Sequence, residues 1–283
     1  MPLVSCKDIL DPARQQGVGV PGIDVIDPAS TEGVINAAEA MGLPIILMVP
    51  ETAFPMLDVK VFFKYLVERA KSTSVPVAVH LDHGESIETL QMAIGCGFSS
   101  VMIDGSSLPL DENIALTRSV VAMAHAQGVS VEAEIGHVGG GEGSFEGTDV
   151  DEGLFTQPED AQRFVEETGV DTLAVAFGTV HGMFNGTPKL DIERLERIRD
   201  RVGIPLVMHG GSGLSDEQFV SAIKGGITKI NLFTELSMTA AAQAIEHGLK
   251  KNKKLHFAEL LLVGQKTTEA MTTKYLKLFS ELT

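Results

Sequence analysis

The sequence predicts a single α/β domain in which eight parallel strands, alternating with helices, close into a barrel. Short apolar, β-branched runs recur eight times along the chain, and helix-like segments separate them. The length of 283 residues is ordinary for one (β/α)8, or TIM, barrel and long for a single sandwich. A doubly wound open sheet is the alternative that the same alternation allows.

The predicted strands are nearly continuous apolar stretches, which is typical of parallel strands buried on both faces. In chain order they are residues 18–25, 44–49, 75–82, 99–105, 129–136, 171–178, 204–211 and 228–234. Since no interdomain linker is recognisable between them, we expect residues 1–283 to form one domain.

The segments between the strands carry the capping residues of helices. Residues 30–42 open with Ser30 and close with Gly42, which predicts an N-cap and a C-cap. The same plan predicts helices over 86–97, 111–128, 157–169, 190–200 and 215–226. Residues 250–283 are also predicted to be helical, as an addition to the barrel.

Charge and cysteine content exclude several classes of function. A net charge of −16 argues against a surface for nucleic acid or anionic membranes, although not against a small phosphorylated substrate. Cys6 and Cys96 form no CxxC pair, which argues against a disulfide framework or a thiolate zinc site. Since neither a signal peptide nor an apolar run of about 18 residues is recognisable, we expect a cytoplasmic protein.

The segment 137–156 is long, rich in glycine and acids, and poor in core residues. Long glycine-rich loops on the catalytic side of a barrel often close over substrate as lids. A lid and an ordinary surface loop fit this composition equally well.

Polar residues gather where the predicted strands end, on the face that carries active sites in barrels. His83, His181 and His209 follow three different strands, and three neutral imidazoles with an open fourth position make a catalytic zinc site. The alternative is that the three histidines are unrelated and form no common site. The other polar residues at these ends include Asp82, Asp104, Ser106, Glu132, Glu134, Asn231 and Thr234.

The remaining histidines are interpreted as structural or solvated. They are His80, His125, His137, His247 and His256. His80 lies two residues before Asp82, so both side chains point to the same face of the strand, and His80 is expected to point inward beneath the site. The runs 209–213, "HGGSG", and 231–234, "NLFT", lie where barrels bind phosphate, because glycines let backbone N–H groups approach the ligand.

Five motifs together carry a resemblance to a known family. They are "VAVHLDHG", "VEAEIGHVGG", "VHGMF", "MHGGSG" and "KINLFTEL", in the family's order. With them the chain resembles, over about residues 5–280, the class II, zinc-dependent ketose-bisphosphate aldolases. The resemblance implies reversible cleavage of a ketose phosphate or bisphosphate between C3 and C4, giving dihydroxyacetone phosphate and an aldehyde through a metal-stabilised enediolate.

The resemblance also implies the metal site and the assembly. His83, His181 and His209 match the ligands of one Zn²⁺ per subunit, and Asp104 and Glu134 match secondary carboxylates of that site. A monovalent cation, Na⁺ or K⁺, is common in the family's pocket. Relatives form homodimers or homotetramers, and residues 234–249 with the C-terminal helices are the expected interface.

Two catalytic residues and a phosphate pocket follow from the same resemblance. Asp82 matches the acid that acts on the C4 hydroxyl, and Glu142, in the glycine-rich loop, falls where the family carries the base for the C3 proton. The pocket for dihydroxyacetone phosphate is matched by Gly182, Gly210, Gly211, Ser212, Asn231 and Thr234.

The sequence departs from the family pattern where the far half of the substrate binds. Asp24 replaces the usual asparagine of the first strand, with Asp27 nearby, and Phe233 stands where fructose-bisphosphate aldolases often have an aspartate. With Thr52, these are the candidate specificity residues. No basic residue for a second phosphate is recognisable, since "KKNKK" (250–254) is interpreted as a solvated helix end. We therefore hypothesise that the aldehyde product is not glyceraldehyde 3-phosphate.

Two other functions fit the same fold. A different metal-dependent enzyme on the barrel, such as an epimerase or a hydrolase, would need no proton acceptor in the loop. A non-catalytic relative would bind no zinc tightly. The complete set of Asp82, His83, Glu142, His181 and His209 counts against both.

Overall fold

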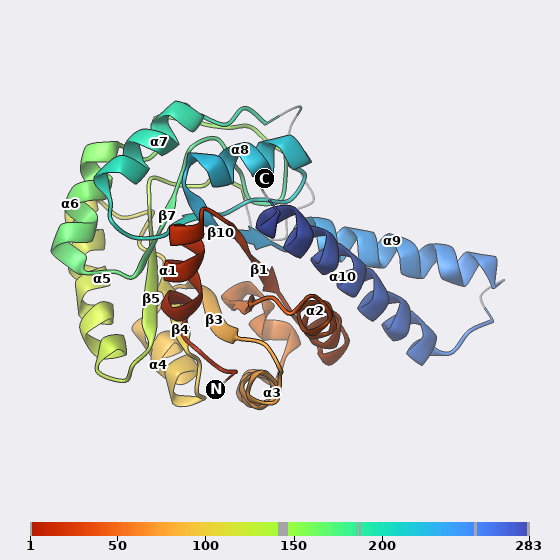
Figure 1. Cartoon of the computed structure of the whole chain (residues 1–283). Coiled ribbons are helices and arrows are strands. Elements are labelled where there is room, and N and C mark those ends of the chain that lie inside the picture. Colours follow the sequence, from red (N-terminus) through yellow and green to blue (C-terminus); the bar gives the residue numbers. More distant parts are fainter. Residues whose placement is uncertain (1, 141–146, 185, 187, 252–253, 282–283) are drawn as a thin grey trace.

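The computed structural model describes residues 2–140, 147–184, 186, 188–251 and 254–281 (Figure 1). Eight strands, all paired in parallel, form a closed barrel, which confirms the predicted fold and excludes the open sheet. In order around the barrel they are β1 (Val20–Asp24), β10 (Ile227–Leu232), β9 (Leu206–Met208), β7 (Thr172–Val175), β5 (Ser130–Ile135), β4 (Ser100–Ile103), β3 (Val77–Gly84) and β2 (Ile45–Pro50).

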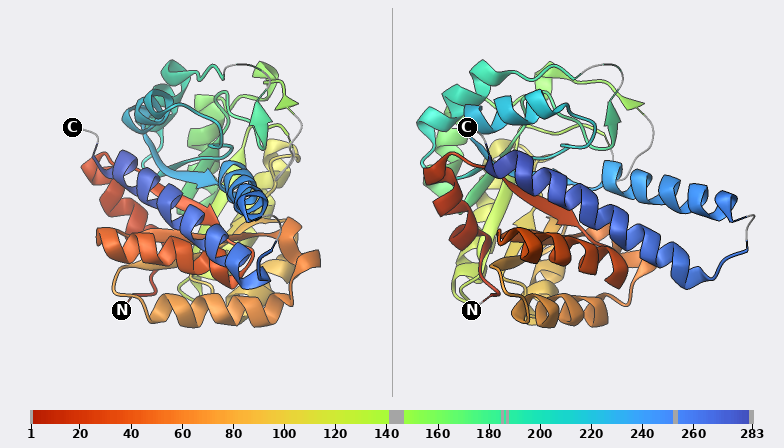
Figure 2. Two further views of the ribbon diagram at one scale, coloured as in Figure 1. Left: turned by 90° about the vertical axis from the view of Figure 1, so that its right-hand side faces the viewer. Right: turned by 45° about the vertical axis from the view of Figure 1, so that its right-hand side comes forward.

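Helices cover the outside of the barrel (Figures 1 and 2). They are α2 (Pro28–Met41), α3 (Val59–Lys71), α4 (Ile87–Gly95), α5 (Leu110–His125), α6 (Pro158–Thr168), α7 (Ile192–Arg201) and α8 (Asp216–Gly225). Two short 3₁₀ helices, η1 (Glu51–Met56) and η2 (Glu152–Leu154), and a parallel pair, β6 (Gly147–Thr148) with β8 (Met183–Phe184), lie in the loops. None of the helices in the described part of the chain is long and apolar enough to cross a membrane.

The first helix, α1 (Cys6–Gln16), was not predicted. Its apolar face, including Cys6, Ile9 and Leu10, packs with Val20 and Ile46 in a small core of its own. These two strand residues lie near the amino-terminal ends of β1 and β2. The helix therefore closes the end of the barrel opposite the predicted site.

Several predicted caps are confirmed, but the N-cap at Ser30 is wrong, and so are both ends of the helix predicted over 111–128, which runs from Leu110 to His125. Helix α2 begins two residues earlier, at Pro28, and Asp27 is its N-cap, accepting hydrogen bonds from the N–H groups of Ala29 and Ser30 at 2.7 and 3.1 Å. Aspartate followed by proline is a strong helix start, because proline needs no hydrogen-bond partner in the first turn. At the other end Gly42 has the left-handed conformation of a C-cap, as predicted.

The predicted C-terminal addition, residues 250–283, contains the helix α10 (Phe257–Ser280). Helix α10 forms a hairpin with α9 (Thr234–Lys250), which follows β10, and the hairpin projects from the barrel (Figures 1 and 2). Helix α10 returns along α2, and a Cβ at Gly33 would lie only 2.5 Å from the carbonyl oxygen of Gln265. Glycine is therefore required where the two helices meet.

The interior of the barrel holds a buried ion pair. Lys229 Nζ lies 2.8 and 3.0 Å from the two carboxylate oxygens of Glu132, and both side chains are inaccessible to solvent. Burial alone would lower the pKa of Lys229, but the charge of Glu132 outweighs it and the pKa is raised. Lys229 is thus held as a cation in the core.

Replacing Lys229 by methionine should lower the free energy of unfolding by about 3–5 kcal/mol, because it leaves the Glu132 carboxylate buried without its cation. Urea titration followed by circular dichroism measures this loss. The exposed Lys224 of α8 supplies the control, since Lys224→Met should change stability by no more than about 0.5 kcal/mol. Equal midpoints for the two variants would contradict the role of the buried pair.

Candidate active site

The end of β3 brings His80, Asp82 and His83 to the mouth of the barrel. In a regular strand His80 and Asp82 share one face, and His83 points to the other. Here the pairing register with β4 shifts between Leu81 and Gly84, and His83 has a φ of +44°, which is costly for a residue other than glycine. This irregularity turns the His83 ring toward the site beside Asp82.

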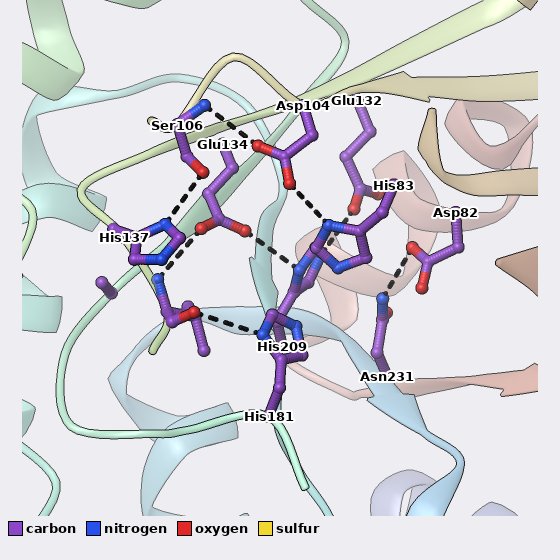
Figure 3. Close-up of polar contacts among 12 residues, drawn as sticks. Asp82, His83, Asp104, Ser106, Glu132, Glu134, His137, His181, His209 and Asn231 are labelled. Carbon is purple, nitrogen blue, oxygen red and sulfur yellow. Dashed lines mark hydrogen bonds and ion pairs between the residues drawn. The ribbon is translucent and has the colours of Figure 1, made fainter. Parts of the chain in front are cut away.

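The three predicted histidines meet at this mouth (Figure 3). The ring centroid of His83 lies 4.8 Å from that of His181 and 4.5 Å from that of His209. Each ring offers one nitrogen to a common point, and these nitrogens lie within 4.8 Å of one another. The structure therefore brings together three imidazoles from three separate strand ends.

Each ring is oriented through its other nitrogen. His83 Nδ1 lies 2.8 Å from Asp104 Oδ2, and His181 Nδ1 lies 3.2 Å from the carbonyl oxygen of Val138. His209 is turned the other way, with Nε2 at 3.0 Å from Glu132 Oε1. Acceptors in these positions hold a proton on the bonded nitrogen and leave a lone pair on the nitrogen that faces the cluster.

The cluster fits a bound cation. Within the described part of the chain, His181 Nε2 is buried and has no hydrogen-bond partner. His209 Nδ1 also faces Glu134 Oε2 at 3.1 Å, so two acceptors oppose each other unless a proton or a metal ion lies between them. Imidazoles with an adjacent carboxylate form a donor set that suits zinc. His83, Asp104 and Glu134 form a second group of ligand atoms with the same spacing.

Burial and neighbouring charges set the protonation of this site. Burial, with His83 and His209 nearby, lowers the pKa of His181 to about 4. Burial and His83 also act to lower the pKa of His209, but its contacts with Glu132 and Glu134 raise it to about 9. In the absence of a metal ion His209 therefore carries a second proton on Nδ1, between the ring and Glu134, and a bound metal ion would displace this proton. Burial acts to raise the pKa of Asp104, yet its bond to His83 lowers it. Neutral His181 and ionised Asp104 are the forms that metal coordination needs.

Asp82 lies beside the cluster in a buried polar contact. Its Oδ1 accepts a hydrogen bond from Asn231 Nδ2 at 3.0 Å, across the barrel from β10. Burial opposes ionisation of Asp82, but the charges of His83 and Lys229 lower its pKa. Asn231 Oδ1 has no hydrogen-bond partner among the described residues, so it can accept one from a substrate hydroxyl. Asp82 is therefore an ionised carboxylate whose orientation is fixed by Asn231.

The predicted phosphate residues surround a small cavity of about 30 Å³ next to Asp82. Gly182, Gly210, Ser212, Asn231 and Thr234 line it. Gly210 has a φ of +64°, and a Cβ there would lie 2.2 Å from the carbonyl oxygen of Val180, so only glycine fits. Gly211 does not line the cavity, and its N–H donates to the carbonyl oxygen of Asn231 at 3.2 Å.

The glycine-rich loop begins and returns beside His181. The His181 N–H donates to the carbonyl oxygen of Gly139 at 2.8 Å, and β6 pairs with β8 just after His181. These contacts place the described ends of the loop at the mouth of the site. Glu142 itself lies outside the described residues.

The candidate specificity residues divide into two groups. Asp24 and Phe233 line the cavity with Asp82. Asp27 is engaged as the N-cap of α2, and Thr52 is exposed on η1 and does not line the cavity. His80 is buried beneath the site, as expected, with Nδ1 at 2.8 Å from Ser100 Oγ.

Sequence reasoning missed two residues that support the site. Lys229 balances the charge of Glu132, which in turn holds His209. In the sequence, Lys229 is recognisable as a lysine within an apolar strand, two residues before Asn231, so both side chains point to the same face of that strand. Asn113 of α5, whose Nδ2 donates to the carbonyl oxygen of Glu134 at 2.8 Å, gives no comparable signal because asparagine is common on helix surfaces.

Comparisons with known proteins agree with this arrangement. Residues 4–282 match the family described as class-II fructose-bisphosphate aldolase. The chain is 42% identical over 262 residues to a fructose-bisphosphate aldolase of Geobacillus stearothermophilus, covering 90% of this chain and 89% of that one. It is 40% identical over 259 residues to one of Staphylococcus aureus, with the same coverage. The crystal structure of the YdjI aldolase of Escherichia coli is similar, with a TM-score of 0.86, 34% identity, and coverage of 98% of this chain and 97% of that one.

Proposed function

The chain belongs to the class-II fructose-bisphosphate aldolase family, whose reaction is the metal-dependent aldol cleavage of a sugar phosphate, and on this premise we propose a role for each residue of the site. His83, His181 and His209 hold one Zn²⁺, with Asp104 and Glu134 as secondary carboxylates. The observation that carries this proposal is the convergence of three oriented imidazoles. His181 presents a buried nitrogen without a hydrogen-bond partner among the described residues, and His209 presents one that faces the carboxylate of Glu134. Na⁺ or K⁺ is proposed as a second ion near the phosphate.

The substrate is a ketose phosphate cleaved between C3 and C4. When bound, the metal supplies Lewis-acid stabilisation of the negative charge that develops beside the ketone. Asp82, held by Asn231, takes the proton of the C4 hydroxyl during cleavage and returns it during condensation. The phosphate of the dihydroxyacetone phosphate half lies against Gly182, Gly210 and Ser212, where close backbone approach is sterically allowed.

Glu142 is proposed as the base that exchanges the C3 proton, carried by the loop whose ends lie beside His181. Glu142→Ala should slow the exchange of the C3 proton of dihydroxyacetone phosphate with solvent by about 10²–10⁴-fold and leave the zinc content unchanged. Proton exchange into ²H₂O, followed by NMR, measures this. The exposed Glu152→Ala of η2 is the matched control. Unchanged exchange and turnover in Glu142→Ala would favour the epimerase or hydrolase instead.

The projecting hairpin is proposed as the contact with a second copy of the chain, in a homodimer or homotetramer. Ile245 and Leu249 of α9 are 65% and 60% exposed, and Phe257 of α10 is 72% exposed. Large apolar side chains gathered at an exposed surface mark interaction sites.

The double variant Ile245→Lys/Leu249→Lys should shift the mass measured by light scattering to that of a monomer, because lysines cannot be buried unpaired in the interface. Glu246→Lys, between them on the same helix, is the control and should keep the assembly. A wild-type protein that is already monomeric at micromolar concentration contradicts the proposal.

A further inference from the structure

A second cavity, of about 160 Å³, lies next to the catalytic one. It is bordered by the end of β1 and the start of α2 on one side, and by α9 and α10 on the other. Asp24 and Phe233 line both cavities, so the two share a wall and are adjacent. We call the second cavity the side chamber.

The lining of the side chamber is acidic and apolar. Asp24 and Asp27 contribute carboxylates, Leu236 and Leu260 contribute apolar surface, and Gln265 and Thr268 can form hydrogen bonds to hydroxyls. No lysine, arginine or histidine is among the described residues that line it. Resting on the proposed function, we infer that the side chamber receives the unphosphorylated C5–C6 end of a ketose 1-phosphate.

Charge is the first reason for this assignment. A second phosphate would carry a charge between about −1.5 and −2 into a partly buried space that already contains carboxylates. Like charges at short range repel strongly where water is scarce. Part of the charge of Asp27 is offset by the N–H groups at the start of α2.

Size is the second reason. The side chamber measures about 160 Å³ against about 30 Å³ for the catalytic cavity, so the C5, O5, C6 and O6 atoms of a six-carbon ketose have more room there than beside Asp82.

The first test compares fructose 1-phosphate with fructose 1,6-bisphosphate on the zinc-loaded enzyme, by release of dihydroxyacetone phosphate from both. We expect kcat/KM for fructose 1-phosphate to be at least about tenfold higher than that for fructose 1,6-bisphosphate. A tenfold ratio corresponds to a difference of about 1.4 kcal/mol in activation free energy. The assignment is overturned if kcat/KM for the bisphosphate equals or exceeds that for fructose 1-phosphate, but this result leaves the aldolase function intact. Failure to release dihydroxyacetone phosphate from either substrate contradicts the proposed function itself.

Gly264 gives a way to fill the side chamber without disturbing the fold. It lines the chamber on α10, and a Cβ there would meet no atom within 4 Å. Leucine also favours the helix more than glycine does. Gly264→Leu should therefore lower kcat/KM for fructose 1-phosphate at least about tenfold but that for xylulose 1-phosphate, which lacks C6, less than about threefold.

Gly248→Leu is the matched control on the same hairpin. Gly248 does not line the chamber, and a Cβ there lies at an ordinary 3.9 Å from Leu255 Cδ2. We expect this variant to keep both rates within about twofold. Equal effects of Gly264→Leu on the two substrates, or none on either, would show that the side chamber does not hold the C6 end.

Asp24→Asn isolates the charge, since it replaces the carboxylate by a neutral group of the same shape. We expect the ratio of kcat/KM for the bisphosphate to that for the monophosphate to rise at least about fivefold. Ser237→Ala, also in the lining but uncharged, should leave this ratio unchanged. An unchanged ratio in Asp24→Asn contradicts the electrostatic part of the inference.

Discussion

Replacing His181 by alanine should abolish zinc binding at the site and lower kcat/KM for ketose phosphate cleavage by about 10³-fold or more. The metal supplies several kcal/mol of charge stabilisation, and each 1.4 kcal/mol corresponds to a factor of ten in rate. His181 is the most informative of the three ligands, because its other nitrogen bonds only a backbone carbonyl. Its loss therefore leaves no carboxylate without a partner.

The measurement combines elemental analysis of zinc after gel filtration with steady-state release of dihydroxyacetone phosphate. His247→Ala is the control, since His247 lies on α9 outside the cluster and contacts Glu259. It should keep one zinc per chain and the full rate. A His181→Ala protein with stoichiometric zinc at the same affinity would exclude the proposed ligand set.

Asp82→Asn should lower kcat by about 10²–10⁴-fold while the zinc content stays at one per chain, because an amide cannot take the proton of the C4 hydroxyl. The contact with Asn231 fixes the position of this carboxylate. Exchange of the C3 proton of dihydroxyacetone phosphate should persist, since it is assigned to Glu142. This separation of two proton transfers distinguishes a catalytic Asp82 from one that only supports the fold.

Asp104→Asn provides the comparison, because Asp104 orients His83 and does not transfer a proton. It should weaken zinc binding by about 10–100-fold and slow both reactions together at limiting zinc. If Asp82→Asn behaves in the same way, with zinc lost and exchange abolished, the assignment of Asp82 as the acid–base residue is wrong.

The barrel could be predicted from the sequence because each strand is buried on both faces and so reads as a continuous apolar run. Helix α1 was missed, since it packs on the end of the barrel and lies outside the strand–helix alternation. The N-cap of α2 was misplaced because Ser30 and Asp27 are both good caps. The Asp27–Pro28 pair is the stronger start, because Asp27 accepts hydrogen bonds from the first N–H groups and proline suits the first turn.

The positions of histidines at strand ends predicted which residues form the cluster, but they did not predict how the rings are oriented. A regular strand would have pointed His83 away from the site, and only the register shift after Leu81 turns it inward. The opposite orientation of His209 depends on Glu132 and Lys229, which meet across the barrel. Contacts between distant strands of this kind leave little trace in local sequence patterns.

The same limit applies to the residues for the far half of the substrate. The sequence made both Asp24 and Asp27 candidates for specificity, yet Asp24 lines the catalytic cavity and Asp27 caps a helix. Phe233 lines the side chamber, and residues of α10, near the end of the chain, form the opposite side of this chamber. Substrate preference therefore depends on how the hairpin packs against the barrel.

Metal-dependent release of dihydroxyacetone phosphate tests the central claim most directly. The protein is dialysed against a chelator, its zinc content is measured, and cleavage of both fructose 1-phosphate and fructose 1,6-bisphosphate is assayed before and after one equivalent of Zn²⁺ is added. We predict that zinc-free protein is at least about 100-fold slower on the preferred substrate and that zinc restores the rate. Full activity in protein shown to be free of metal would contradict the account.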